Sequence, residues 1–231
     1  MQELNELDDF FFDLDKTIWN WDDSIIGAED LVDSLRESGK SYYFHTDNTL
    51  LSRREYARKL SSMGFPADEE DVLTSGYVAA EKLGRDGVTR AYVVGEKGLI
   101  DELEARDIEV SQDSNAVVVG LDRQFNYSKL RKAVDILGDG GKLYICSTER
   151  TFRKTSGEQP HQAAINQALK EFTDESQVEL VGKPSEVFRD VFRNYFTYLP
   201  TGSVFIGDRM ADVRTGNKLG MTTGAVMSGD L

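Results

Sequence analysis

Short apolar stretches alternate with amphipathic stretches along this chain of 231 residues, and no other feature constrains the fold as strongly. The strand-like runs lie at 10–14, 41–45, 91–94, 116–121, 143–146, 178–181, 203–206 and 222–226. Between them lie helix-like stretches at 28–37, 128–137 and 161–172, one opened by a capping box at 52–55, and one that follows Ser185. Strands that alternate with helices favour an α/β protein with parallel strands.

The first strand-like run ends in two acids. Phe10-Phe11-Phe12 leads into Asp13-Leu14-Asp15. Side chains at i and i+2 of a strand point the same way, so Asp13 and Asp15 should face one site unless the strand has already turned. Two carboxylates that close must share a proton or a cation. The pair alone also fits a solvated strand end, so the rest of the chain must decide between the two interpretations.

Three further polar clusters follow strand-like runs: Thr46-Asp47-Asn48, Gly182-Lys183-Pro184, and Gly207-Asp208 with Asp212. Sites in open parallel sheets form beyond the carboxyl ends of the strands, so these clusters should converge with the first pair. Each cluster has a plainer interpretation by itself. Thr46 fits a helix entry, Lys183 a surface lysine, and Asp208 with Asp212 a turn and a helix N-terminus. Their joint order favours one site with acids for a metal and for catalysis, a hydroxyl, and one lysine.

The charge and cysteine content exclude some classes of protein. A net charge of −14 argues against a nucleic-acid binder, which needs a basic face, although an acidic surface suits high salt. No apolar stretch is long enough to span a membrane, and residues 1–9 lack the layout of a signal peptide. The single cysteine, Cys146, lies in a strand-like run and reads as an inert thiol, which fits a reducing compartment. We therefore expect a cytoplasmic protein.

The order Asp-x-Asp-x-Thr, Phe-x-Thr, Gly-Lys-Pro and Gly-Asp-Arg-x-x-Asp resembles the haloacid dehalogenase (HAD) superfamily, in particular its NagD / 4-nitrophenylphosphatase-like branch. Further stretches similar to this branch are Thr74-Ser75-Gly76 and Val119-Gly120-Leu121-Asp122 with Phe125-Asn126-Tyr127. The resemblance covers nearly the whole chain. It implies a Rossmann-like parallel sheet core formed by 1–75 and 177–231, with an inserted α/β cap domain at 76–176. It also implies a homodimer that forms through the cap.

The resemblance implies a magnesium-dependent phosphatase that hydrolyses a small phosphate monoester through a phosphoaspartate. Asp13 would be the nucleophile, and Asp15 would be the general acid and then the base for water. Mg²⁺ would be held by the Asp13 carboxylate, the Asp15 backbone carbonyl and the Asp208 carboxylate. Asp212 would lie in or near the second shell of ligands. The phosphate group would be bound by Thr46, Asp47, Asn48 and Lys183.

The chain departs from the branch pattern at several positions. Lys16 stands where many relatives have glycine, and Asp47 stands where the branch has asparagine. If the Asp47 carboxylate faced phosphate it would weaken binding, whereas a contribution from the backbone amide alone would change little. The cap segment 147–150 lacks the usual Thr-Asn-Pro-Asp, which leaves the substrate open. The basic residues Arg150, Arg153 and Lys154 fit either an anionic substrate or a solvated loop.

Two other functions are compatible with parts of the pattern. A non-catalytic phospho-acceptor of the receiver type also uses Asp, Thr, Lys and magnesium, but its phosphorylated Asp lies on a middle strand and it has no large insertion. A HAD-like fold kept as a binding module is the third interpretation. We expect His45 to pack against the far side of its strand from Thr46. Trp19 and Trp21 fit either substrate contact or packing.

Overall fold

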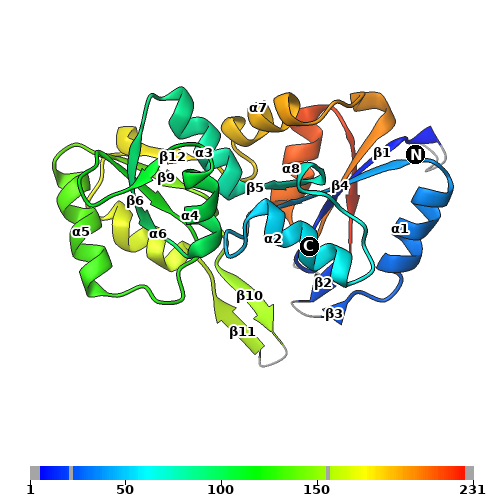
Figure 1. The fold of residues 1–231 in the computed structure, drawn as a ribbon, viewed down its shortest axis with the longest axis horizontal. Coiled ribbons are helices and arrows are strands. Elements are labelled where there is room, and N and C mark those ends of the chain that lie inside the picture. Colours follow the sequence, from blue (N-terminus) through cyan, green and yellow to red (C-terminus); the bar gives the residue numbers. More distant parts are fainter. Residues whose placement is uncertain (1–5, 21–22, 155–156, 227–231) are drawn as a thin grey trace. The chain divides into compact units, whose positions relative to one another are not determined.

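A computed structural model describes residues 6–20, 23–154 and 157–226, which divide into two compact units. The first unit takes 1–46, 54–73 and 189–231, and the second takes 47–53 and 74–188. Each unit is built on its own sheet (Figure 1). The protein is therefore an α/β protein in which a second α/β unit is inserted into the chain of a Rossmann-like parallel sheet core.

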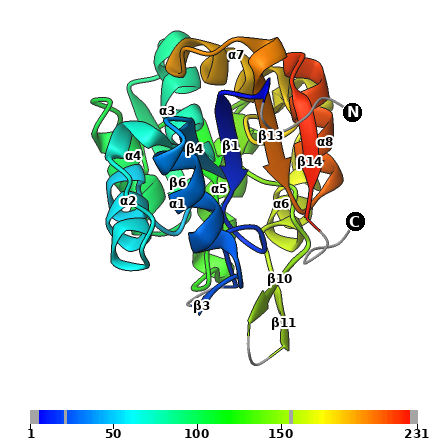
Figure 2. The same ribbon diagram turned by 90° about the vertical axis from the view of Figure 1, so that its right-hand side faces the viewer.

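The sheet of the first unit has five strands in the order β14-β13-β1-β4-β5, and β1 lies between β4 and β13 (Figure 2). These strands are β14 (Thr222–Ala225), β13 (Ser203–Gly207), β1 (Asp9–Asp13), β4 (Ser41–Thr46) and β5 (Val72–Thr74). Both neighbours of β1 run parallel to it. The helices of this unit include α1 (Ala28–Glu37), α8 (Met210–Leu219) and most of α2 (Arg53–Ser62) and α7 (Glu186–Tyr195). Two short strands, β2 (Trp19–Asn20) and β3 (Asp23–Ser24), follow β1 and pair antiparallel.

Aromatic rings fill one face of the central strand. The Phe11 ring lies 5.0 Å from that of Tyr43 on β4 and 4.9 Å from that of Phe192 on α7. The rings of Phe192 and Phe205 lie 5.6 Å apart, so α7 covers this face of the sheet. The burial of these aromatic rings against β1 holds this strand in place within the sheet.

The second unit contains a parallel five-stranded sheet in the order β12-β9-β8-β6-β7. Its strands are β12 (Val178–Leu180), β9 (Lys142–Ile145), β8 (Ala116–Val119), β6 (Arg90–Val94) and β7 (Glu109–Val110). Its helices include α3 (Ser75–Arg85), α4 (Lys97–Glu104), α5 (Tyr127–Gly138) and α6 (Ala163–Lys170). An antiparallel hairpin of β10 (Thr151–Lys154) and β11 (Gly157–Pro160) completes the described strands.

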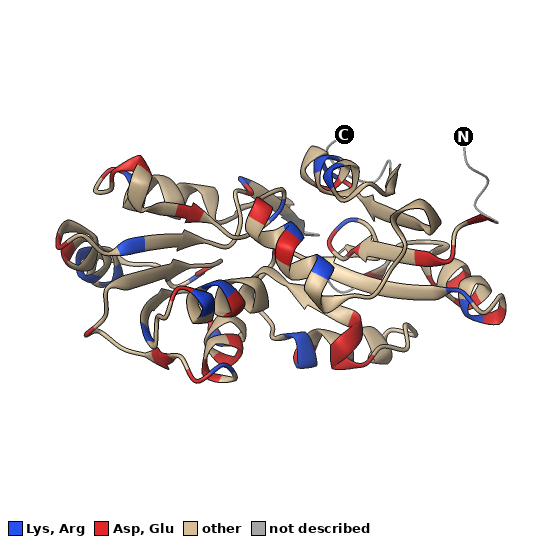
Figure 3. Cartoon of the chain, turned by 90° about the horizontal axis from the view of Figure 1, so that it is seen from above, with Lys and Arg blue, Asp and Glu red and all other residues tan. Residues whose placement is uncertain are grey.

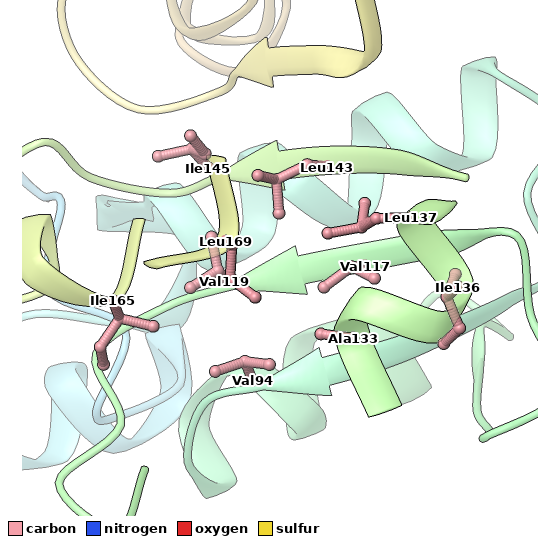
Figure 4. Packing of buried hydrophobic residues seen from close by; sticks show 10 residues of the cluster. All are labelled: Val94, Val117, Val119, Ala133, Ile136, Leu137, Leu143, Ile145, Ile165 and Leu169. Carbon is pink, nitrogen blue, oxygen red and sulfur yellow. The ribbon is translucent and has the colours of Figure 1, made fainter. Parts of the chain in front are cut away.

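Helices α5 and α6 pack on this second sheet through a cluster of aliphatic side chains (Figure 4). The cluster joins Val117 and Val119 of β8 to Ala133 and Leu137 of α5 and to Leu169 of α6. All five side chains are almost fully buried. Within the predicted run 116–121, residues 116–119 form β8, all of whose side chains are buried, as in a strand covered on both faces.

The second unit extends along the chain to residue 188, and the predicted division into a core at 1–75 and 177–231 and a cap at 76–176 stays a prediction. Strand β12 at 178–180 pairs with β9, at the edge of the second sheet, and residues up to 188 group with the second unit. The short run Val178–Leu180 follows β9 and α6 along the chain and adds to the same sheet.

Charged residues of both signs occur on the helices of both units (Figure 3). Among the described residues no helix has both the length and the apolar character that a membrane span requires.

Candidate functional site

The acid at the end of β1 lies beside a buried histidine. Asp13 is paired with His45 in the β1–β4 register, so both side chains leave the same face of the sheet. The His45 Nδ1 lies 3.7 Å from the Asp13 Oδ1, and the imidazole stacks on Phe205 at 4.0 Å. The expectation that His45 is packed is confirmed, but its position next to Asp13 was not foreseen.

Three aspartates of the first unit gather around one arginine. Arg209 lies within 3.9 Å of Asp13, 3.5 Å of Asp208 and 3.9 Å of Asp212, measured between guanidinium nitrogen and carboxylate oxygen. All three carboxylates are almost fully buried. Asp212 also accepts the backbone N–H of Arg209 at 3.1 Å, and thereby caps the start of α8.

Gly207 makes room for this group of acids. A Cβ at Gly207 would lie 2.3 Å from the Asp212 carboxyl carbon, a distance that no real side chain tolerates. A glycine at the last position of β13 is therefore a steric requirement for the close approach of Asp212. The sequence pattern included Arg209 in the motif but gave it no role.

The donor chemistry fits magnesium. Asp13, Asp208 and Asp212 supply buried oxygen ligands, which Mg²⁺ prefers, and burial of several carboxylates favours a cation beside them. Asp13, His45 and Asp212 each place one donor atom within 4.8 Å of the others. The imidazole is the exception in this set, because nitrogen suits transition metals better than magnesium.

Asp15 lies in the turn that follows β1 and is partly exposed. Its carboxylate Oδ1 accepts the indole N–H of Trp19 at 3.0 Å. Trp19 is only 1% exposed, so the packing interpretation of this residue holds. Trp21 lies outside the described residues.

Asp47 and Lys183 belong to the second unit and lie together there. The Asp47 Oδ1 accepts the backbone N–H of Lys183 at 3.1 Å, and the Asp47 carbonyl accepts the Ser75 hydroxyl at 2.9 Å. A Cβ at Gly182 would lie 1.9 Å from the Cys146 carbonyl oxygen, so only glycine fits before Lys183. The acid that replaces asparagine thus holds the loop that carries the lysine.

Thr46 and Asn48 are buried at the end of β4 and just beyond it. The Asn48 Oδ1 accepts the backbone N–H of Leu50 at 3.1 Å, a local turn that fixes the chain direction after the strand. Roles for Thr46, Asp47, Asn48 and Lys183 in phosphate binding stay predictions.

A cavity of about 390 Å³ lies in the second unit near α6. The residues that line it include Phe125, Phe152, His161 and Arg123. The Arg123 guanidinium donates to both carboxylate oxygens of Glu96, at 2.8 and 2.6 Å, so its charge is matched by an acid of the same unit.

The basic cap residues lie on or near the β10–β11 hairpin. Arg150 is exposed, and its carbonyl accepts the backbone N–H of His161 at 2.9 Å. Arg153 and Lys154 belong to β10, where they pair with Glu158 and Gly157, but their side chains lie outside the description. Contact of these residues with a substrate stays open.

Comparison with known proteins identifies relatives along the whole chain. Two family models match, one described as haloacid dehalogenase-like hydrolase over 10–109 and one as HAD-hydrolase-like over 180–230. The chloroplastic phosphoglycolate phosphatase 1A of Arabidopsis thaliana is 29% identical over 255 residues, covering 99% of this chain and 70% of that protein. Human chronophin is 28% identical over 237 residues, covering 94% of this chain and 80% of its own. The crystal structure of the 4-nitrophenylphosphatase of Thermotoga maritima matches with a TM-score of 0.89 at 28% identity, covering 99% of this chain and 88% of that one.

Proposed function

The chain belongs to the haloacid dehalogenase superfamily, and on that premise we propose that it is a phosphatase that hydrolyses small phosphate monoesters with magnesium through a phosphoaspartate. The observation that carries the proposal is the buried cluster of Asp13, Asp208 and Asp212 at the end of the first sheet. The named phosphatases among its relatives support the reaction class.

In the first half-reaction, an oxygen of the Asp13 carboxylate attacks phosphorus and the bond from phosphorus to the ester oxygen breaks. Asp15 gives its proton to the departing oxygen. In the second half-reaction, Asp15 takes a proton from water, the water oxygen attacks phosphorus, and the Asp13 carboxylate is released. Dividing hydrolysis into two transfers is the benefit of covalent catalysis.

The residues proposed to hold Mg²⁺ are the Asp13 and Asp208 carboxylates and the Asp15 backbone carbonyl, with Asp212 beside them. The ion, when bound, supplies positive charge to the phosphate oxygens. The protein's own part is to keep three acids together, and Arg209 lowers the electrostatic cost of doing so.

We propose that Thr46, Lys183 and the backbone amides near Asp47 and Asn48 bind the phosphate group. The Asp47 carboxylate is engaged by the Lys183 backbone N–H, which supports a positioning role for this acid over direct contact with phosphate. We also propose a cytoplasmic location, which the single buried thiol supports, and a homodimer formed through the cap, which the oligomeric state in solution would test.

The test is a screen of phosphate esters with Mg²⁺ at low and high salt, including phosphoglycolate, glycerol phosphate, nucleotides and sugar phosphates. We expect turnover of at least one ester that EDTA abolishes. Asp13→Asn should lower kcat by about three orders of magnitude or more, since the nucleophile is lost. Unchanged turnover in Asp13→Asn would refute the assignment. A stable phosphoprotein formed from acetyl phosphate, without release of phosphate, would favour the phospho-acceptor alternative.

A further inference from the structure

The carboxylate of Asp15 accepts a hydrogen bond from the side chain of Trp19, which is itself held by other residues. The Trp19 indole Nε1–H donates to the Asp15 Oδ1 at 3.0 Å. The backbone closes the same turn, because Lys16 N–H donates to the Trp19 carbonyl at 2.7 Å and Trp19 N–H donates to the Leu14 carbonyl at 3.2 Å. Asp15 and Trp19 also form an isolated β-bridge, which places the two residues side by side.

Residues of α2 fix the indole ring from outside the turn. The Trp19 ring stacks on Tyr56 with an interplanar angle of 16° and a centroid distance of 6.1 Å. The Lys59 ammonium lies 4.3 Å from the centroid of the Trp19 ring. A cation over the ring face draws electron density from the indole and makes its N–H a stronger donor. A buried tryptophan needs such a hydrogen-bond partner for its N–H, and here the partner is a carboxylate.

The hydrogen bond distinguishes the two oxygens of Asp15. An oxygen that accepts the indole N–H has a lone pair engaged, which favours the other oxygen, Oδ2, as the one that carries and donates the carboxyl proton. A general acid works only if its proton points at the leaving oxygen, and a side chain free to rotate loses that alignment.

We propose that Trp19 is a positioning residue that directs the proton of Asp15 toward the leaving group, with Tyr56 and Lys59 holding the indole in place. This inference rests on the proposed phosphatase function. In the step concerned, the bond from phosphorus to the ester oxygen breaks, its electron pair stays on that oxygen, and the proton moves there from the Asp15 Oδ2.

Two substrates with different leaving groups separate this role from simple packing. 4-Nitrophenolate leaves as a stable anion and needs little proton donation, whereas the alkoxide of glycerol phosphate must be protonated as it departs. The quantity to measure is kcat/KM, because it reports the steps up to cleavage of the ester bond and excludes the later hydrolysis of the phosphoenzyme.

For Trp19→Phe we expect kcat/KM to fall by about 10- to 100-fold with glycerol phosphate and by no more than about threefold with 4-nitrophenyl phosphate. Phenylalanine keeps an aromatic ring at this position but removes the N–H. A merely structural role would lower both values in the same proportion, because a loss of folded protein affects every substrate alike, and that result would overturn the proposal.

Lys59→Met provides a second variant that leaves the indole N–H in place. It should shift the ratio of the two kcat/KM values in the same direction by a smaller factor, and it decides the question if Trp19→Phe does not fold. An unchanged ratio in a folded Lys59→Met, together with an unchanged ratio or no fold in Trp19→Phe, would overturn the proposal. Absence of magnesium-dependent turnover of every ester in the screen by the unmodified protein would instead refute the proposed function itself.

Discussion

The two sheets of this molecule share one architecture but treat the acids at their strand ends differently. In the second unit, Glu96 follows β6 and binds Arg123, while Asp122 follows β8 and binds Lys129 at 2.5 Å. In the first unit, Asp13, Asp208 and Asp212 surround one guanidinium, that of Arg209. An acid paired with its own cation stabilises a fold, whereas carboxylates that lie close together repel each other. On the proposed function, the first sheet is the place where stability is given up for chemistry.

The largest expected contrast is in activity. Asp208→Asn removes a proposed magnesium ligand and should lower kcat/KM by about 100-fold or more at fixed Mg²⁺, with a partial recovery at high Mg²⁺. Asp122→Asn makes the same chemical change at a strand end of the second sheet and should alter kcat/KM by less than about threefold once folded protein is counted. Steady-state kinetics over a Mg²⁺ titration measures both. Equal losses in the two variants would remove the functional distinction between the sheets.

The same two substitutions should shift stability in opposite directions. In EDTA, Asp208→Asn relieves repulsion among three buried acids and should raise the free energy of unfolding by up to about 1 kcal/mol. Asp122→Asn weakens the pairing of a buried carboxylate with Lys129. This substitution should lower the free energy of unfolding by about 1–2 kcal/mol. Urea unfolding followed by circular dichroism measures both values. Destabilisation by Asp208→Asn in EDTA would mean that the first cluster is as well matched in charge as the second.

Much of the strand layout could be predicted from the sequence because its runs are buried on both faces. The run at 10–14 corresponds to β1 at 9–13, and the helix predicted at 28–37 has those bounds. The hairpin of β10 and β11 was missed, since Thr151-Phe152-Arg153-Lys154 has no alternation of apolar and polar residues that would signal a strand. Local pattern likewise gives no information on sheet membership, which is why β12 could not be assigned to the second sheet.

Within the candidate site, the identity of the acids could be predicted but their partners could not. The glycine before Asp208 and the second acid four residues later, Asp212, form a local motif that can be read directly from the sequence. The contact of His45 with Asp13 depends on the β1–β4 register, which aligns residues 32 positions apart. The hydrogen bond from the Lys183 amide to Asp47 joins residues 136 positions apart. Such pairings arise from tertiary packing and leave no local signal.

The smallest effect concerns the pH dependence of the one-to-one pairs. The side-chain hydrogen bond from Arg123 lowers the pKa of Glu96 below its ordinary value of 4.5, against the opposing effect of burial. Because the folded-state pKa is depressed, the ion pair stabilises the fold above pH 4.5, and this contribution is lost as the pH falls through the folded-state pKa.

Glu96→Gln should therefore lower the free energy of unfolding by about 0.5 kcal/mol at pH 7, a small value because the Arg123 side chain is 49% exposed and screened by solvent. The difference in the free energy of unfolding between Glu96→Gln and the unmodified protein should shrink progressively below pH 4.5. Glu104→Gln, at the exposed end of α4, makes the same change of charge and serves as the control. If the effect of Glu96→Gln were constant from pH 7 to pH 4, or matched that of Glu104→Gln throughout, the Glu96–Arg123 pair would not be a stabilising ion pair. The second sheet would then lose one of the two matched acids on which its contrast with the first sheet depends.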